Sequence, residues 1–429
     1  MAASIPPELI EAIVEHIPNV ASLKSCSLVS PTFRVPCQKR LHPSLHLEFV
    51  GPDSQRYRRT SEAVSRRFEE SPHLAAFITH LILEIVSPWN GPDDQSAFAR
   101  HVFARLGHVK KTSIFGGRLG GAMWSSLPPD LDSAVLEWLA HRGSTEPLQE
   151  LVLANICLPE AAVPVIFSSA ASLVLHNCTL EHMPASQQQA TVKSAPQVRA
   201  QARALRRFEA HSSWRVVELL CRQEHHWHVS ALRSLALRLG IMNDNTSLGM
   251  FADLCASSAD TLTSLKLWIP IIDPRQRELL LQRFTAALPH VRAVSVILEA
   301  LRSPDELDSS LWVLRRVMSP ALLPCLTQIT YIVYLRLETR ILPMNTNLHS
   351  TARAFETFKA DWLTSYDEFV TDHPSLTSFV WEAKFYALTL GDVRDDDARR
   401  HEFERFCGET QRVMPKAHGK GLLVFRLGD

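Results

Sequence analysis

The stretches "SALRSLAL" at residues 230–237 and "DTLTSLKL" at residues 260–267 share one spacing of apolar residues. In the first, Leu232 is followed by Leu235 and then by Leu237. The last two leucines of each stretch alternate with a polar or small residue, which is typical of a β-strand with one buried face. We therefore expect a strand at the end of each stretch.

The same unit recurs along the chain, often after a proline. Further copies are "EPLQELVL" (146–153), "LPHVRAVSV" (288–296), "LPCLTQITY" (323–331) and "HPSLTSFVW" (373–381). Three equivalent residues, Leu235, Leu265 and Val294, lie 30 and 29 positions apart. Helical patterns between the strands are expected at 54–70, 96–106, 132–141, 274–287, 304–317 and 352–370. Alternating strands and helices at this spacing predict an α/β fold with parallel strands and right-handed crossovers.

The strand unit resembles a leucine-rich repeat of the form LxxLxLxxN/CxL. "LQELVLANICL" and "SLVLHNCTL" supply the residues that follow such a strand, at Asn155, Asn177 and Cys178. The resemblance implies an irregular solenoid over residues 45–429, in which stacked repeats bury a continuous core. A compact α/β domain with strands that are alike by chance is the alternative. "LLVFRL" (422–427) predicts a last strand, and "GDVRDDDARR" (391–400) predicts an exposed loop.

The first forty residues differ from the rest and predict three short helices. Pro6 and Pro7 suit the first turn of a helix, after a cap at Ser4. Leu9, Ile13 and Ile17 then recur every four residues, with Ile10 and Val14 beside them. Caps at Ser22 and Ser30 would begin two further helices, and Pro36 predicts a kink or a late start in the third.

Three such helices are too small to bury a large core. Their apolar residues cover more than one face of each helix, so part of this surface must be covered by something else. The helices could form a cap on the following domain, or they could dock onto a partner protein. The sequence pattern leaves both possibilities open.

"IPPELIEAIVEHIPNVASLKSCSLVSPTFRVPCQKRL", residues 5–41, resembles an F-box in the form common in fungal F-box proteins. The resemblance covers residues 4 to about 44 and rests on a spaced pattern over three helices. It implies docking onto the Skp-type adaptor of a cullin-RING ubiquitin ligase. Pro31 departs from the basic or cysteine residue that many members carry there. Matched by position, the residues implied as adaptor contacts are Pro6, Leu9, Ile13, Leu23, Leu28, Val29 and Phe33.

The resemblance also implies that two parts of the chain bind different partners. Residues 1–44 would hold the adaptor, and residues 45–429 would hold an unknown target protein. The chain would then be a substrate receptor that positions a target and performs no covalent chemistry itself. The alternative function is an F-box scaffold or interaction protein with no role in ubiquitylation.

Charge and cysteine content argue against nucleic-acid binding, membrane binding and a disulfide framework. The 429 residues hold 45 Lys plus Arg and 45 Asp plus Glu, so the net charge of zero gives no general attraction to nucleic acid or to an anionic membrane. The eight cysteines form no CxxC pair. Because no signal peptide is apparent at the start, we expect free thiols and a cytoplasmic or nuclear location.

Motifs for catalysis or for cofactors are mostly missing. "CRQEHHWH" (221–228) gathers possible metal ligands, but it lacks the second ligand pair of a structural zinc site, and a solvated loop or helix end is the alternative. "GGRLGG" (116–121) lacks the Lys-Ser/Thr of a P-loop and the order of a dinucleotide turn. No GxSxG or HExxH motif is present. We therefore expect no enzyme, no cofactor and no metal.

Overall fold

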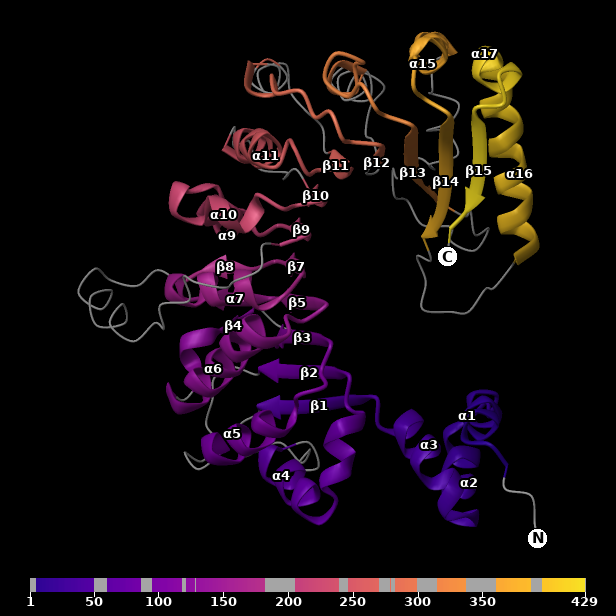
Figure 1. The fold of residues 1–429 in the computed structure, drawn as a ribbon. Helices are drawn as coiled ribbons and strands as arrows, with labels where there is room; N and C mark the ends of the chain where they lie inside the picture. The colour runs from indigo at the N-terminus through magenta and orange to yellow at the C-terminus, as the bar shows by residue number, and fades with distance from the viewer. Residues whose placement is uncertain are drawn as a thin grey trace, which may run out of the picture. The chain divides into compact units, whose positions relative to one another are not determined.

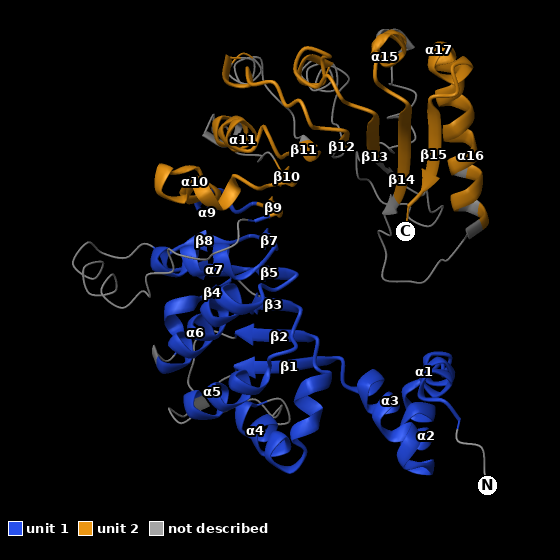
Figure 2. Ribbon diagram, viewed as in Figure 1, with its two compact units in different colours: residues 1–205, 212–216 blue, residues 206–211, 217–429 orange. Residues whose placement is uncertain are grey.

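The chain forms two compact units in the computed structural model, each built from parallel strands and helices (Figure 2). The described residues are 5–49, 60–85, 95–117, 121–127, 129–181, 205–238, 246–269, 278, 282–298, 315–336, 360–386 and 396–428. Unit 1 comprises residues 1–205 and 212–216, and unit 2 comprises residues 206–211 and 217–429. The expected boundary at residue 44 therefore lies inside unit 1, where it separates three helices from the first strand.

Unit 1 begins with the helices α1 (Pro7–Glu15), α2 (Val20–Val29) and α3 (Pro31–Leu41). Its main sheet has the order β1 (Ser44–Phe49), β2 (His80–Ile85), β3 (Lys111–Gly116), β5 (Glu150–Ala154) and β7 (Ser172–His176). Short strands β4 (Ala122–Met123), β6 (Ile156–Leu158) and β8 (Thr179–Leu180) form a second parallel sheet. The connecting helices are α4 (Ser61–Glu70), α5 (Gln95–Arg105), α6 (Pro129–Thr145) and α7 (Val163–Ser169), with 3-10 turns at Pro72–Phe77, Trp124–Ser126 and Glu160–Ala162.

The apolar positions of the unit 1 strands align across the sheet. The pairs Leu47↔Leu83, Leu83↔Ile114, Ile114↔Leu153 and Leu153↔Leu175 make one continuous row of fully buried side chains. Neighbouring residues along each strand point to the other face of the sheet. The helices α4 to α7 follow one another along one side of these strands (Figure 1).

Polar residues and a glycine shape the turns that follow these strands. Asn155 and Asn177 have φ values of 56° and 51°, and the Asn177 amide donates to Asn155 Oδ1 at 3.2 Å. Asparagine adopts this left-handed conformation more readily than most residues, which explains its place after the strand. At Gly116, a Cβ atom would lie 1.9 Å from the backbone oxygen of Asn155. The chain therefore requires glycine at this close approach.

Unit 2 continues the same design with longer strands toward its end. Its strands are β9 (Arg207–His211), β10 (Ser234–Arg238), β11 (Ser264–Ile269), β12 (Ala293–Leu298), β13 (Gln328–Arg336), β14 (Ser378–Tyr386) and β15 (Leu423–Leu427), all paired in parallel in this order. Its helices are α9 (Trp214–Cys221), which crosses the boundary in sequence, α10 (His226–Val229), α11 (Thr246–Ser257), α15 (Ala360–Asp372), α16 (Asp396–Val413) and α17 (Pro415–Gly419), with a 3-10 turn at Gln223–His225.

The register of unit 2 confirms the spacing read from the sequence. Leu235 pairs with Leu265, which pairs with Val294, so the intervals of 30 and 29 residues each bring the chain back to the same row. The row continues through Ile329 and Phe379, and all five side chains are buried. The expected last strand is also present as β15.

Several helix predictions hold, and others need correction. α5, α6 and α15 overlap the expected helices at 96–106, 132–141 and 352–370. Most of the expected helices at 274–287 and 304–317 lies outside the described residues. Residues 396–400, expected in a loop, form the start of α16. The prediction missed that acidic residues at a helix start stabilise it through the helix dipole. Within the described part of the chain, no helix has the length and apolar character needed to cross a bilayer.

Candidate docking surface

The three N-terminal helices pack around a small apolar interior. Its buried members are Ile10, Val14, Leu23 and Cys37, one or two from each helix, and Ile17, Cys26, Phe33 and Leu41 pack against them. Ile10 and Val14 lie one turn apart on α1, so this helix turns one apolar stripe inward. The helices therefore form a unit with an interior of their own rather than a layer laid flat on the sheet.

Local hydrogen bonds fix where these helices begin. α1 starts at Pro7, where a missing N–H costs nothing, and Pro6 precedes it without a side-chain cap; the expected cap, Ser4, lies outside the described residues. The Asn19 side chain accepts a hydrogen bond from the Ser22 backbone N–H at 2.8 Å, so Asn19 and not the expected Ser22 caps α2. Ser30 caps α3 as expected, through its hydroxyl and the Thr32 N–H. α3 begins at Pro31 and continues through Pro36 to Leu41, so of the expected kink or late start at Pro36 the late start is wrong.

Arg40 ties α3 to the end of α1. Its guanidinium Nη1 donates to the backbone oxygen of Val14 and, at 3.0 Å, to that of Ile17. A cation at the C-terminal end of a helix also interacts favourably with the helix dipole. A second polar link between the two helices, Lys39 to Glu11 at 3.5 Å, joins two exposed side chains and contributes little. Arg40 is thus the polar contact that best fixes the direction of α1.

A second apolar stripe on these helices faces outward. In the described part of the chain, twelve large apolar side chains are exposed, and seven of them lie between residues 5 and 35. Leu28 and Val29 at the end of α2 are 84% and 79% exposed. The seven are Ile5, Leu9, Ile13, Val20, Leu28, Val29 and Val35. We call this set the outer apolar face. A cluster of exposed apolar side chains of this kind is typical of a surface that binds a partner.

The structure separates the seven expected adaptor contacts into two groups. Pro6, Leu9, Ile13, Leu28 and Val29 are exposed, and the last four belong to the outer apolar face. Leu23 and Phe33 instead belong to the interior of the three helices, Leu23 fully and Phe33 partly. Their position suits them to hold the helices together, and a partner could reach Leu23 only after the helices moved apart.

Three members of the outer apolar face were not singled out from the sequence. Ile5 lies four residues before Leu9 and continues its stripe just ahead of the helix, which a strict period-four count would have found. Val20 and Val35 carry no such signal. On α2, apolar residues occur all round the helix, so spacing alone does not separate its inner side from its outer side.

A polar network on unit 2 is the second surface with organised side chains. The Glu209 carboxylate accepts hydrogen bonds from Arg207 at 2.9 Å and from His211 at 3.0 Å, and Lys266 lies over the Trp268 ring at 4.5 Å. Burial alone would raise the pKa of Glu209, but these hydrogen bonds and the charge of Lys266 lower it to about 2. The network gives the non-helical side of β9–β11 a fixed pattern of charge.

The possible metal ligands are only partly brought together. In the histidine-rich stretch, His228 is fully buried and its pKa is lowered to about 3 by burial and by the nearby His225, while Cys221 Sγ contacts the Met250 carbonyl oxygen. No metal-binding group forms from that stretch within the described residues; His46, Glu48 and Glu84 make the one such group there. In it, His46 Nε2 lies 3.2 Å from a Glu84 oxygen, a contact that needs no metal ion between the two side chains.

Comparisons with known proteins leave the chain without a family assignment. A scan against models of protein families finds no match, and a search of curated proteins finds no significant match.

Proposed function

We propose that this chain is an F-box substrate receptor, whose N-terminal helices bind a Skp-type adaptor of a cullin-RING ubiquitin ligase. The observation that carries the proposal is the outer apolar face. It lies on the helices whose sequence resembles an F-box, and it includes four residues that the resemblance implied as contacts: Leu9, Ile13, Leu28 and Val29.

The energetics are compatible with reversible docking. Fully burying one such side chain contributes roughly 1.5–3 kcal/mol, so the four together contribute about 6–12 kcal/mol before costs. Association costs about 4–15 kcal/mol in lost freedom of movement. Because the helices already have an interior and an Arg40 link, little further ordering of this surface is needed. Contacts from Pro6 and the rest of the outer apolar face would supply the further binding free energy that is needed to exceed this cost.

The leucine-rich-repeat-like region is proposed to hold the target protein. Parallel strands in register with buried rows, and Asn155 and Asn177 in the left-handed turn after their strands, support the resemblance to such repeats. The receptor would act by position, since it raises the effective concentration of target lysines near the ubiquitin-loaded enzyme. In this role the chain itself performs no covalent chemistry.

Co-purification of the full chain with a Skp-type adaptor tests the proposal. Leu9→Asp places a charge within the outer apolar face, and we expect the adaptor affinity to fall by at least ~2 kcal/mol, or about 30-fold. Leu427→Asp, at a similarly exposed leucine on β15, is the matched control and should bind as the unchanged protein does. Absence of adaptor binding by the unchanged protein would refute the proposal, and equal binding by a folded Leu9→Asp variant would remove Leu9 from the interface.

Adaptor binding alone leaves the alternative of a scaffold. The two roles differ in what the assembled complex does, because a substrate receptor must recruit the cullin and promote ubiquitylation of a bound protein. Capture of the cullin together with ubiquitylated proteins supports the receptor. An adaptor complex that never contains either supports the scaffold.

A further inference from the structure

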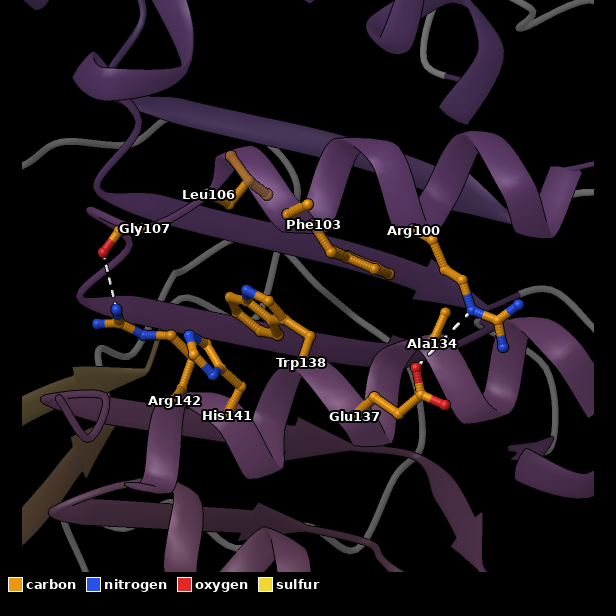
Figure 3. A pocket seen from close by; sticks show the side chains of 10 residues that line it. Arg100, Phe103, Leu106, Gly107, Ala134, Glu137, Trp138, His141 and Arg142 are labelled. Carbon is orange, nitrogen blue, oxygen red and sulfur yellow. Dashed lines mark hydrogen bonds and ion pairs between the residues drawn. The ribbon is translucent and has the colours of Figure 1, made fainter. Parts of the chain in front are cut away.

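A pocket lies between α5 and α6 of unit 1, away from the outer apolar face. Its volume is about 430 Å³, within the range of sites that bind small organic molecules (Figure 3). The side chains that matter for its chemistry come from both helices and from the residues after α5: Arg100, Phe103, Leu106, Trp138, His141 and Arg142.

The middle of the pocket is apolar. The rings of Phe103 and Trp138 stack with their centres 5.6 Å apart and their planes 24° from parallel. Leu106 lies beside them and is fully buried. Aromatic and branched aliphatic groups bind well against such walls, since they bury apolar area without leaving a polar group unpaired.

One end of the pocket offers hydrogen-bond donors that lack acceptors. Trp138 is 6% exposed, and its indole N–H donates no hydrogen bond within the described part of the chain but still reaches solvent. In Figure 3 the indole nitrogen lies on the side of the ring toward Leu106 and Gly107. The Nε atom of Arg142, also in the pocket lining, is buried and has no acceptor within the described residues, and leaving a buried donor unpaired costs free energy. A bound molecule with an acceptor would supply that partner.

Arg142 adds a buried positive charge at the same end. Its guanidinium donates to the backbone oxygens of Gly107 at 2.7 Å and Val109 at 3.0 Å, and both acceptors are neutral. The nearest carboxylate, Glu146, lies 4.0 Å away on a well-exposed side chain. Burial lowers the pKa of Arg142, and Glu146 offsets this only in part. An anion in the pocket would compensate this charge, and His141 is placed to assist.

The residues at the other end of the pocket do not cancel the preference for an anion. Glu137 is the acidic residue among the pocket lining, and it pairs with Arg100 at 3.8 Å. With Glu137 balanced by Arg100, the lining keeps the positive charge of Arg142 and the donors of Trp138 and His141. A neutral apolar ligand would leave these groups without partners.

We propose that this pocket binds a carboxylate carried on an aromatic or branched aliphatic group. The apolar group would lie against Phe103 and Leu106, and the carboxylate would accept from Trp138 and face Arg142. This chemistry occurs both in free organic acids and in the last residue of a polypeptide that ends in Phe or Leu. The inference does not depend on the proposed adaptor docking, which uses other residues of unit 1.

Titration calorimetry on the full chain tests the inference with 3-phenylpropionate and its neutral match, 3-phenylpropionamide. We expect the acid to bind and the amide to bind at least ~10-fold more weakly, since a hydrogen bond to a charged group is worth more than a neutral one. Trp138→Phe keeps the aromatic wall and removes the N–H, and it should lower the affinity for the acid by about 2–10-fold. Trp227→Phe, at an exposed tryptophan of α10, is the matched control.

Peptides ending in Gly-Gly-Phe, with a free or an amidated end, distinguish the two sources. If 3-phenylpropionate binds and the free-ended peptide does not, the pocket is a site for small organic acids. If the free-ended peptide binds more tightly than 3-phenylpropionate, the pocket is a site for the end of a polypeptide. The inference is overturned if neither ligand binds at up to about 10 mM, if acid and amide bind equally, or if a folded Trp138→Phe variant binds the acid unchanged.

Discussion

Replacement of Arg40 by methionine should loosen α1 while leaving the rest of the fold intact. The variant keeps an unbranched apolar stem but removes the donor that reaches the backbone oxygens of Val14 and Ile17. Hydrogen bonds to charged groups contribute about 1.5–3 kcal/mol each. Because one of these two bonds is exposed to solvent, we expect about 1–3 kcal/mol for the pair together.

Hydrogen exchange of the α1 backbone amides measures this loss directly. If α1 opens locally, 1–3 kcal/mol corresponds to an increase in exchange of about 5–150-fold. Peptides from β10 to β14 should exchange as before, since their buried rows do not involve Arg40. Arg34→Met, on the same helix, is the matched control because Arg34 is exposed and makes no hydrogen bond or ion pair within the described residues.

The outcome bears on the proposed docking as well as on stability. α1 carries Leu9 and Ile13, so adaptor affinity in the same variant should fall only in proportion to the fraction of molecules in which α1 stays closed. The reasoning is refuted if Arg40→Met leaves α1 exchange within a factor of about two of the unchanged protein. It is equally refuted if Arg34→Met accelerates exchange as much.

Two further predictions concern the repeat region. Gly116→Ala should destabilise the protein by about 1–3 kcal/mol or more, because its new Cβ atom would overlap the Asn155 carbonyl. Thermal unfolding should show a lower midpoint. The control Gly408→Ala, in an open helical position, should raise the midpoint slightly. Glu209 has a folded pKa of about 2, below the usual 4.5, so it stabilises the protein above about pH 4.5 and this contribution disappears as the pH falls to about 2. Glu209→Gln should therefore lose about 2–4 kcal/mol of unfolding free energy at pH 7 and little at pH 2, and urea unfolding that shows the same loss at both pH values would contradict this.

The repeat region shows what apolar spacing can predict. The strand positions follow from period-two alternation, and the intervals between Leu235, Leu265 and Val294 predict the register because each repeat must return its leucines to one buried row. The left-handed turns at Asn155 and Asn177 follow from residue type. These features are local, or they repeat, so the sequence alone contains them.

Features that depend on which elements meet were not predictable in the same way. The pocket between α5 and α6 needs Phe103 and Trp138 from separate helices, and the Arg142 contacts to Gly107 and Val109 span more than thirty residues. The Glu209 network joins residues of β9 to Lys266 of β11. No spacing rule brings these side chains together, because their partners are set by the order of strands and helices in the fold.

The N-terminal helices show why the candidate docking residues could be read only in part. Two apolar stripes run along α1, one through Leu9 and Ile13 and one through Ile10 and Val14, and both satisfy the helical period. Only the packing of α2 and α3 decides that Ile10 and Val14 turn inward. Once that choice is made, Leu9 and Ile13 must face outward, about 100° round the helix. The interior of the three helices accommodates one of the two stripes, so the other stays exposed, and it is this stripe that the proposed adaptor would cover.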